Sequence, residues 1–277
     1  MPAGHSAKIA IKRAFKSLVR MAGPVLRVPP PCVRILTYHN VGSSSHEMNV
    51  TPEAFRAQME WLHANCPVVT LDDHVLSKNG VAITFDDGYR DNLVNAAPVL
   101  HELGLPATVF MIAGRAGTSI RDEADPEVAR LMSWDELREI AAMGVTIGSH
   151  TMTHPHLSSL DELAQLEEMS TSKRILEETL NRPVPAFAYP FGSSLDFTGA
   201  TVRLAQRAGY SVAVSNQYGV NTMNSNPWVL RRIWIDRSDS LDTFQAKVTG
   251  DLDGLRLLDC PVGIRGRRLL NRLMRIG

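Results

Sequence analysis

Short apolar segments alternate with longer amphipathic segments along the middle of the chain. The apolar segments are rich in β-branched residues, and they predict strands at 35–39, 81–85, 107–112, 145–148, 186–189, 211–214 and 229–235. The amphipathic segments have helical spacing, and they predict helices at 52–64, 92–103, 134–143, 160–180, 196–208 and 240–252. Such alternation is typical of parallel βαβ units, so we expect an α/β fold in which seven strands form a barrel or a strongly curled sheet.

Capping residues support several of the predicted helix ends. Thr51 and Ser133 stand directly before predicted helices, where a hydroxyl can accept a hydrogen bond from a free backbone N–H. Asp91 has the same position before 92–103, so we interpret it as an N-cap. Gly144 and Gly209 stand just past predicted helix ends, where a left-handed residue is favoured.

Composition indicates a globular protein with a substantial core. The chain has 277 residues, of which 44% are hydrophobic and 21% are charged. These values exclude a disordered chain and a small disulfide scaffold. Cys32, Cys66 and Cys260 form no CxxC pair, which argues against a zinc ribbon or a dithiol redox motif, and we interpret them as small buried hydrophobic residues or inert thiols.

The net charge of zero hides two basic ends. Residues 1–34 hold seven basic and no acidic residues, and residues 261–277 hold five arginines and no acid. The remaining 17 basic residues and all 29 acids lie in 35–260, which therefore carries a net charge of −12. We predict a basic amphipathic arm with a proline-rich spacer at 1–33, one main folded domain at 34–258 and a basic amphipathic tail at 259–277.

Two interpretations of these ends remain open. Apolar residues interleave with the basic ones at roughly helical spacing, so the ends are either solvated or docked terminal helices, or helices that lie on an anionic membrane surface. Aromatic residues are scarce there, which argues against a nucleic-acid partner. Pro24 and Arg27 interrupt the apolar segment that a secretory signal needs, so we expect a cytoplasmic protein that can be peripheral to the inner face of the membrane.

Reactive polar residues cluster where predicted strands end. The segment 81–85 is followed by Asp86 and Asp87, two adjacent carboxylates that repel each other unless a cation or a proton separates their roles. The alternative is a plain acidic turn, because Asp-Asp-Gly is a good turn sequence.

Three histidines follow the strand predicted at 145–148. His150 and His154 are four residues apart, so a turn can place both rings on one side, and imidazole with carboxylate suits zinc and its neighbours. An exposed histidine loop is the alternative. His156 has the weaker case as a ligand, and we interpret it as a packing or supporting residue.

These segments resemble two motifs of the polysaccharide deacetylase (NodB-homology) family. The matching sequences are TFDDGY at 84–89 and SHTMTHP at 149–155, and the resemblance extends over about 34–237. It implies a distorted (β/α)7-type barrel that hydrolyses N-acetyl groups of hexosamine glycans with a divalent metal, zinc first, with cobalt, nickel or manganese as alternatives. By the same resemblance Asp86 is the base, and Asp87, His150 and His154 are the metal ligands.

A third family motif matches FAYPFG at 187–192. The resemblance implies that the backbone N–H of Phe191 stabilises the oxyanion, and it suggests substrate contacts at Tyr189, Pro190 and Tyr89. Many members have an arginine where this chain has Tyr189. We therefore predict that Arg232 contacts the base aspartate instead, the alternative being a surface strand arginine.

Many family members have a histidine near the C-terminal end of the domain as the general acid. This chain has no histidine after His156, so the acid must be another residue. The sequence Tyr38-His39-Asn40-Val41 resembles the opening of exopolysaccharide deacetylases, in which this early histidine is the acid. First and last strands are neighbours in a closed barrel, so we predict His39 as the acid, against a structural strand-end histidine.

The sequence therefore predicts a metal-dependent hydrolase that acts on an N-acetylated glycan. Two alternatives stay open: a deformylase or amidohydrolase acting on another small amide, and a silent glycan-binding or membrane-peripheral scaffold. A charge-rich ligand cluster argues against the silent scaffold.

Overall fold

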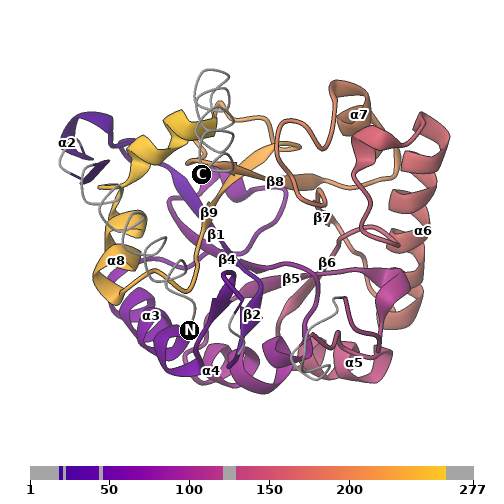
Figure 1. The fold of residues 1–277 in the computed structure, drawn as a ribbon, viewed down its shortest axis with the longest axis horizontal. Helices are drawn as coiled ribbons and strands as arrows, with labels where there is room; N and C mark the ends of the chain where they lie inside the picture. The colour runs from indigo at the N-terminus through magenta and orange to yellow at the C-terminus, as the bar shows by residue number, and fades with distance from the viewer. Residues whose placement is uncertain (1–18, 21–22, 44–45, 121–128, 260–277) are drawn as a thin grey trace, which may run out of the picture.

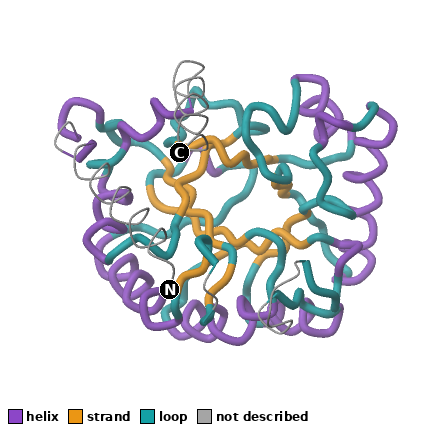
Figure 2. The backbone as a smooth tube through the Cα atoms, in the orientation of Figure 1, coloured by secondary structure: helices purple, strands orange, loops and turns teal. Residues whose placement is uncertain are grey.

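The molecule is a closed barrel of seven parallel strands surrounded by helices (Figures 1 and 2). The computed structural model describes residues 19–20, 23–43, 46–120 and 129–259. The strands are β1 (Val33–Tyr38), β4 (Gly80–Phe85), β5 (Ala107–Met111), β6 (Thr146–Ser149), β7 (Ala186–Ala188), β8 (Val212–Tyr218) and β9 (Leu230–Trp234), and they pair in that order. The barrel closes where β1 pairs with β9, at Leu36 with Ile233 and Thr37 with Trp234.

The predicted barrel is confirmed, and so is its distortion. Strands β6 and β7 share a single register pair, Ser149 with Phe187, and the register of β8 against β9 shifts between Val214 and Tyr218. The predicted strand boundaries agree with the observed ones within two residues, except that β8 continues to Tyr218.

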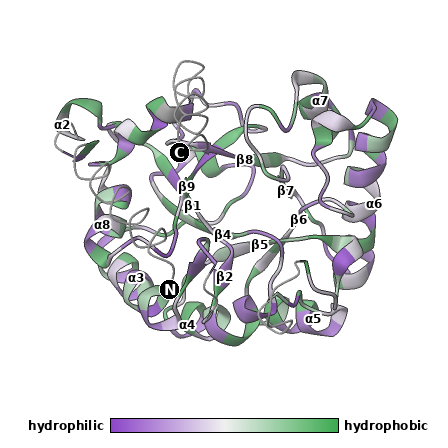
Figure 3. Ribbon diagram, in the orientation of Figure 1, coloured by the Kyte–Doolittle hydropathy of each residue, from purple (hydrophilic) through white to green (hydrophobic). Residues whose placement is uncertain are grey.

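Helices cover the outside of the barrel and turn their apolar faces to the strands (Figure 3). The longer ones are α3 (Pro52–Asn65), α4 (Ala97–Glu102), α5 (Trp134–Ala142), α6 (Glu162–Leu180), α7 (Gly199–Arg207) and α8 (Leu241–Thr249). Short helical segments are α2 (Gly23–Leu26), η1 (Val75–Ser77), η3 (Ala113–Arg115), η4 (Leu157–Ser159) and η5 (Asp253–Asp259). The sequence predicted all six longer helices.

Local capping chemistry explains several helix ends. Thr51 accepts a hydrogen bond from the Ala54 N–H, and Ser133 forms a capping box with Glu136. Gly144 and Gly209 have φ values of 96° and 86°. These four predictions are confirmed.

The predicted helix 92–103 is two elements. It starts as a π-helical segment, η2 (Asn92–Ala96), and continues as α4. Pro98 in the first turn of α4 has no N–H to donate to the preceding turn, so a regular α-helix cannot run through this point. The N-cap interpretation of Asp91 was wrong, because its side chain makes no capping hydrogen bond.

Alternate positions on the strands fill the inside of the barrel. An apolar cluster there includes Ile35, Ala82, Phe110, Ala188 and Leu230, all buried. A Cβ on Gly148 would lie 2.4 Å from the ring of Phe110, so only glycine leaves room for that ring. On several strands, the next inward-facing position, two residues later, carries a polar side chain. These polar side chains form part of the site described next.

A two-stranded sheet lies beside the mouth of the barrel and was not predicted. It pairs β2 (Asn40–Val41) with β3 (Asn49–Val50). Asn49 fixes the turn between them, since its side chain accepts from the Gly42 N–H and donates to the Gly42 carbonyl.

Some sequence predictions lie wholly or mostly outside the described residues. These are the basic amphipathic arm, apart from its last part, and the basic tail with Cys260. Cys32 is buried and Cys66 is half-buried, and both are free thiols. No helix of the described chain is both long and apolar enough to cross a membrane.

Candidate active site

The candidate site lies at the carboxyl end of the barrel, where β4 and β6 run into tight turns. Asp86 and Asp87 follow β4 and are both buried. The Asp86 N–H donates to the Tyr38 carbonyl, which continues the pairing with β1, whereas Asp87 has a φ of 70°. This change of backbone conformation lets the two adjacent carboxylates point to different partners.

Asp86 forms a bidentate ion pair with Arg232, a residue of β9 whose side chain lies inside the barrel. The Nη1 and Nη2 atoms of Arg232 lie 2.7 and 2.6 Å from the two carboxylate oxygens of Asp86. The Arg232 side chain is fully buried, and it also donates to Asn216 and to the backbone oxygen of Ser215. Arg232 is therefore not a surface strand arginine, and the predicted contact with Asp86 is present.

Asp87 faces two imidazoles. Its Oδ1 lies 3.6 Å from His150 Nε2 and 3.5 Å from His154 Nε2. One ligand atom from each of the three residues lies within 4.8 Å of the others. One carboxylate and two imidazoles in this arrangement fit a divalent cation of the zinc type, with coordination positions left over for other ligands.

Backbone and side-chain contacts orient the two imidazoles. His150 Nδ1 lies 2.8 Å from the Ala188 carbonyl, which can only accept, so Nδ1 carries a proton and Nε2 is the ring nitrogen that faces Asp87. The His154 N–H donates to the Thr151 hydroxyl, and both Thr151 and His154 have positive φ.

Glu168 on α6 supports the turn between the two histidines. Its Oε2 accepts from the backbone N–H groups of Met152 and Thr153, both at 2.9 Å, and its Oε1 accepts from the Thr153 hydroxyl at 2.7 Å. These bonds fix a turn that would otherwise leave two N–H groups unsatisfied. Sequence reasoning missed Glu168, although an acidic residue on the inward side of a helix was a usable signal.

Phe191, in the turn after β7, lies beside His154 and His156. It has a φ of 58°, and its ring stacks on His156 at 3.7 Å and meets the edge of His154 at 4.7 Å. Its N–H makes no hydrogen bond within the described part of the chain, whereas its carbonyl accepts from Asn216. The next residue, Gly192, has a φ of 63°, and a Cβ there would lie 2.6 Å from the Asn216 nitrogen.

His156 supports the Phe191 ring. Its Nδ1 lies 2.8 Å from the carboxylate of Asp196, which also accepts from the Ser193 N–H and hydroxyl. The predicted supporting place of His156 therefore agrees with where it lies, beside Phe191 and outside the three-residue cluster.

His39 reaches the site from the end of β1. Its Nε2 lies 4.0 Å from Asp86 Oδ2, and the Asn92 amide holds its backbone carbonyl. The first and last strands of the barrel thus bring His39 and Arg232 to the same carboxylate.

The electrostatic environment separates the protonation states of these groups. Burial is the largest single effect on Asp86 and would raise its pKa, but the charge and hydrogen bonds of Arg232, together with His150 and His39, outweigh burial and hold that pKa far below its usual range. Burial, with the charge of His150 second, lowers the pKa of His154 to about 4. Burial also lowers the pKa of His39, although Asp87 and Asp86 oppose this shift. At neutral pH the site therefore holds a charged Asp86, and the His154 and His39 side chains are neutral.

The three side chains that the sequence predicted as substrate contacts are all buried: Tyr89, Tyr189 and Pro190. The Tyr189 ring stacks on Phe197, and its hydroxyl donates to the Trp228 carbonyl, so it fills the core beneath the site.

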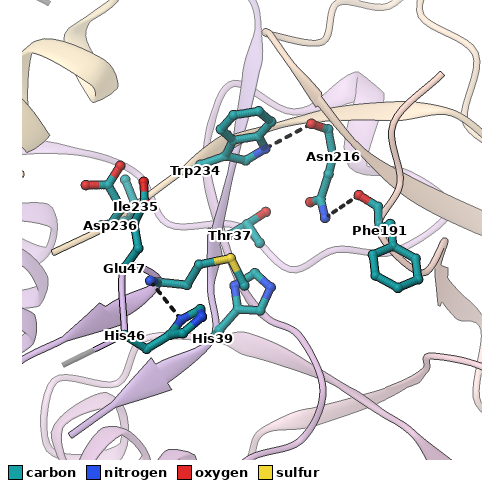
Figure 4. A pocket seen from close by; sticks show the side chains of 10 residues that line it. Thr37, His39, His46, Glu47, Phe191, Asn216, Trp234, Ile235 and Asp236 are labelled. Carbon is teal, nitrogen blue, oxygen red and sulfur yellow. Dashed lines mark hydrogen bonds between the residues drawn. The ribbon is translucent and has the colours of Figure 1, made fainter. Parts of the chain in front are cut away.

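A hollow of about 420 Å³ opens beside the site (Figure 4). His39 and Phe191 lie on its wall, as do Asn216 and Trp234. Asn216 connects the parts of the site, because it bonds Arg232, the Phe191 carbonyl and the indole N–H of Trp234. Sequence reasoning did not identify Asn216, which lies in a strand with no local motif around it.

The fold and the site define a class of protein: a parallel barrel with a candidate cation site beside a buried acid. The candidate ligands are one carboxylate and two imidazoles at the carboxyl ends of the strands. Comparison with known proteins identifies the family. The family model described as polysaccharide deacetylase matches residues 73–213. YxkH of Bacillus subtilis (strain 168), which carries the name polysaccharide deacetylase, is 30% identical over 228 residues, covering 79% of this chain and 77% of that protein. The chain belongs to the polysaccharide deacetylase family, as its motifs predicted.

Two further relatives agree with this assignment. The poly-β-1,6-N-acetyl-D-glucosamine N-deacetylase of Staphylococcus aureus (strain MRSA252) is 26% identical over 213 residues, covering 70% of this chain and 71% of that protein. The structure of the Streptococcus pyogenes deacetylase PplD in complex with acetate superposes with a TM-score of 0.68 at 25% identity. It covers 79% of this chain and 99% of that one.

Proposed function

We propose that this chain is a metal-dependent hydrolase that removes N-acetyl groups from N-acetylhexosamine units of a polysaccharide. The observation that carries the proposal is the adjacency of two units: the Asp86–Arg232 ion pair and the cluster of Asp87, His150 and His154. The first keeps a carboxylate charged but away from the cluster, and the second fits a divalent cation. Poly-β-1,6-N-acetylglucosamine is the first substrate to test, because it is named for a relative that covers most of the chain.

Asp87, His150 and His154 would hold the cation, zinc first, which would supply a Lewis acid for the acetyl carbonyl and lower the pKa of a water molecule. Asp86 accepts the proton of that water as its oxygen attacks the carbonyl carbon. Arg232 keeps the Asp86 carboxylate ionised and fixes its direction. Asp86 is thus a base whose orientation is set before substrate arrives.

Phe191 and His39 carry out the remaining steps, oxyanion stabilisation and protonation of the leaving nitrogen. The Phe191 N–H donates a hydrogen bond to the oxygen on which negative charge develops. His39 donates a proton to the sugar nitrogen as the C–N bond breaks. Its Nε2 lies 4.0 Å from Asp86 Oδ2, so the proton that Asp86 took up is the nearest source for His39. The products are acetate and the free amine.

The test uses the purified full chain. We expect about one equivalent of bound zinc per chain, and acetate released from poly-β-1,6-N-acetylglucosamine or chitooligosaccharides. Release of formate from N-formyl sugars, with no acetate release, would identify a deformylase. No bound metal and no release after zinc or cobalt is added would favour the scaffold.

Two adjacent variants separate the metal from the base. Asp87→Asn should lose zinc and activity together, since it removes the one carboxylate ligand. Asp86→Asn should keep zinc and lose at least about 100-fold in kcat, because an amide cannot accept the proton. Retained zinc shows that Asp86→Asn is folded, and a near-normal rate in this variant would refute the role of Asp86 as base.

A further inference from the structure

Two asparagine side chains of η2 hold the segment of chain that carries His39. His39 stands between the last residue of β1 and the first residue of β2, and its backbone carbonyl accepts a hydrogen bond from Asn92 Nδ2 at 2.8 Å. Asn95 Nδ2 donates to the Val41 carbonyl at 2.7 Å. Asn92 and Asn95 belong to the same π-helical turn, so this turn presents both amides to the segment 39–41.

Asp91, directly before η2, holds the same segment. Its carboxylate accepts hydrogen bonds from the Asn40 side chain at 3.2 Å and from the Val41 N–H. It also accepts from Asn92 Nδ2 at 3.1 Å. The approach is close, since a Cβ on Gly42 would lie 3.0 Å from Asp91 Oδ2. All three residues of 39–41 are therefore bonded to this turn or to the residue before it.

Asp91 fixes the direction in which the Asn92 amide points. The ionised Asp91 carboxylate and the His39 carbonyl can only accept hydrogen bonds, so the Asn92 atom between them is the nitrogen, with one proton for each. With the amide turned over, its oxygen would face two acceptors. Asn92 is buried, and its Oδ1 has no hydrogen-bond partner among the described residues. The amide therefore keeps both bonds at its nitrogen and has none at its oxygen.

This arrangement is unfavourable for the stability of the fold. A buried amide oxygen without a hydrogen bond destabilises the folded state, and burial raises the pKa of Asp91 to about 6, which disfavours the ionised carboxylate. Groups that reduce stability are expected where function requires them. The functional residue that these groups support is His39.

The His39 ring depends on its backbone for its place. Neither ring nitrogen makes a hydrogen bond within the described part of the chain, and Nε2 lies 4.0 Å from Asp86 Oδ2. The ring lies on the wall of the hollow of about 420 Å³, which leaves room for it to move (Figure 4). A displacement of about 1 Å at a reacting group can lower a rate about 100-fold, so the bonds that hold this backbone affect the chemistry.

We propose that Asp91 and Asn92 are positioning residues for His39, which hold the backbone of 39–41 so that the imidazole stays beside Asp86 and within reach of the sugar nitrogen. They act through His39 and do not themselves contact the reacting atoms. This inference rests on the proposed deacetylase function, in which His39 protonates the leaving amine.

The first test compares an amide substrate with an aryl ester. Cleavage of an N-acetylglucosamine oligomer needs a proton at the leaving nitrogen, whereas 4-nitrophenyl acetate releases a phenolate that leaves without one. Asn92→Ala should lower kcat/KM on the order of tenfold on the oligomer and less than about twofold on the ester. Asn65→Ala is the matched control, because it removes an exposed amide-to-carbonyl hydrogen bond to Trp61 and should change neither rate.

Asp91→Ala should show the same difference between the two substrates, and Asp91→Asn, which keeps one acceptor oxygen, should show a smaller one. Loss by one common factor on both substrates would indicate damage to the metal cluster or to the fold, and it would overturn the proposal.

A double variant shows whether Asn92 acts through His39. His39→Ala should itself lower kcat/KM on the oligomer, and adding Asn92→Ala to it should lower the rate by no more than about twofold further. Losses that multiply in the double variant would show that Asn92 acts elsewhere and would refute its positioning role.

An NMR titration separates this inference from the proposed function. Burial is the largest influence on His39 and lowers its pKa. If Asn92→Ala releases the ring into the hollow, the His39 pKa should rise toward the ordinary value of histidine, whereas Asn65→Ala should leave it unchanged. This rise would support the positioning role even when no substrate releases acetate. Acetate release with an unshifted His39 pKa and an unchanged ratio of amide to ester cleavage would instead support the function and refute the positioning role.

Discussion

Arg232 helps to keep the buried Asp86 carboxylate ionised, because the opposite charges of the two side chains compensate each other. Both side chains are almost fully buried, and two short hydrogen bonds join them. Removing one partner of such a pair leaves an uncompensated charge in the interior, which costs about 3–5 kcal/mol.

Arg232→Gln should therefore lower the free energy of unfolding by about 3–5 kcal/mol, measured by urea denaturation. Arg231→Gln, one residue earlier and only partly buried, is the control and should cost less than about 1 kcal/mol. The double variant Asp86→Asn, Arg232→Gln should recover part of the loss, since no charge then remains unpaired. A double variant as unstable as the sum of the two single ones would contradict this account.

Glu168 is not one of the candidate metal ligands, but it supports the turn that holds two of them, His150 and His154. Glu168→Ala removes the acceptor of all three hydrogen bonds that support the Met152–Thr153 turn. We expect zinc affinity to fall by about 10–100-fold, measured by competition with a chelating dye. Glu167→Ala on the exposed side of the same helix should leave the affinity unchanged. Unaltered affinity in Glu168→Ala would mean that the turn holds its shape without the carboxylate.

For individual residues, motifs in the sequence predicted the side chains that come together in the site, but they did not predict the side chains that support them. Asp86, Asp87, His150 and His154 stand in contiguous segments, so their chemistry is visible in one dimension. Glu168 and Asn216 act through long-range contacts with backbone groups, which leave no local pattern. Tyr189 shows that a residue inside a motif can have its side chain in the core, which the motif itself does not reveal.

Among the elements, the turns that follow β4, β6 and β7 carry the strain of the site. Four of the five non-glycine residues with positive φ in the described chain are Asp87, Thr151, His154 and Phe191. Such conformations cost of order 1 kcal/mol or more each and persist only where surrounding bonds enforce them. The rigid barrel and Glu168 provide that enforcement here.

The junction between the small β2–β3 sheet and η2 contains a buried carboxyl group. Asp91 accepts hydrogen bonds from the side chains of Asn40 and Asn92, and burial raises its pKa to about 6. A carboxyl group whose pKa is raised on folding stabilises the fold below about pH 4, and this contribution disappears as the pH rises through 6.

Asp91→Asn should accordingly stabilise the chain by about 2–3 kcal/mol at pH 8 and by little at pH 4. Urea unfolding of both proteins across this range measures the difference. Asp135→Asn, at an exposed side chain, is the control. An offset between Asp91→Asn and the wild type that does not vary with pH would contradict the assignment.

Element types were predictable because strand and helix periodicities differ and because caps act locally. The exceptions have tertiary causes. The π-helical start of 92–103 follows from Pro98, and the β2–β3 pairing depends on the Asn49 side chain closing a turn. Asp91 has the sequence position of a cap, but hydrogen bonds from Asn40 and Asn92 engage its side chain instead.

For the molecule as a whole, the charge distribution predicts how it meets a surface. We propose that the basic ends attach the chain to an anionic membrane, on the cytoplasmic side. The chain should sediment with phosphatidylglycerol vesicles at low ionic strength and be released as salt is raised to about 0.5 M. Neutral phosphatidylcholine vesicles are the control, and replacing the five arginines of 261–277 by glutamine should weaken binding. Retention at high salt would refute an electrostatic attachment.

The closure of the barrel by β1 and β9 has a consequence for when the protein can work. His39 comes from the first strand and Arg232 from the last, and both meet Asp86 only after β9 docks. During synthesis, Asp86 therefore lacks its counter-charge until β9 has been made and has paired with β1. A translation product that stops before β9 would have neither a closed barrel nor the arginine partner of Asp86.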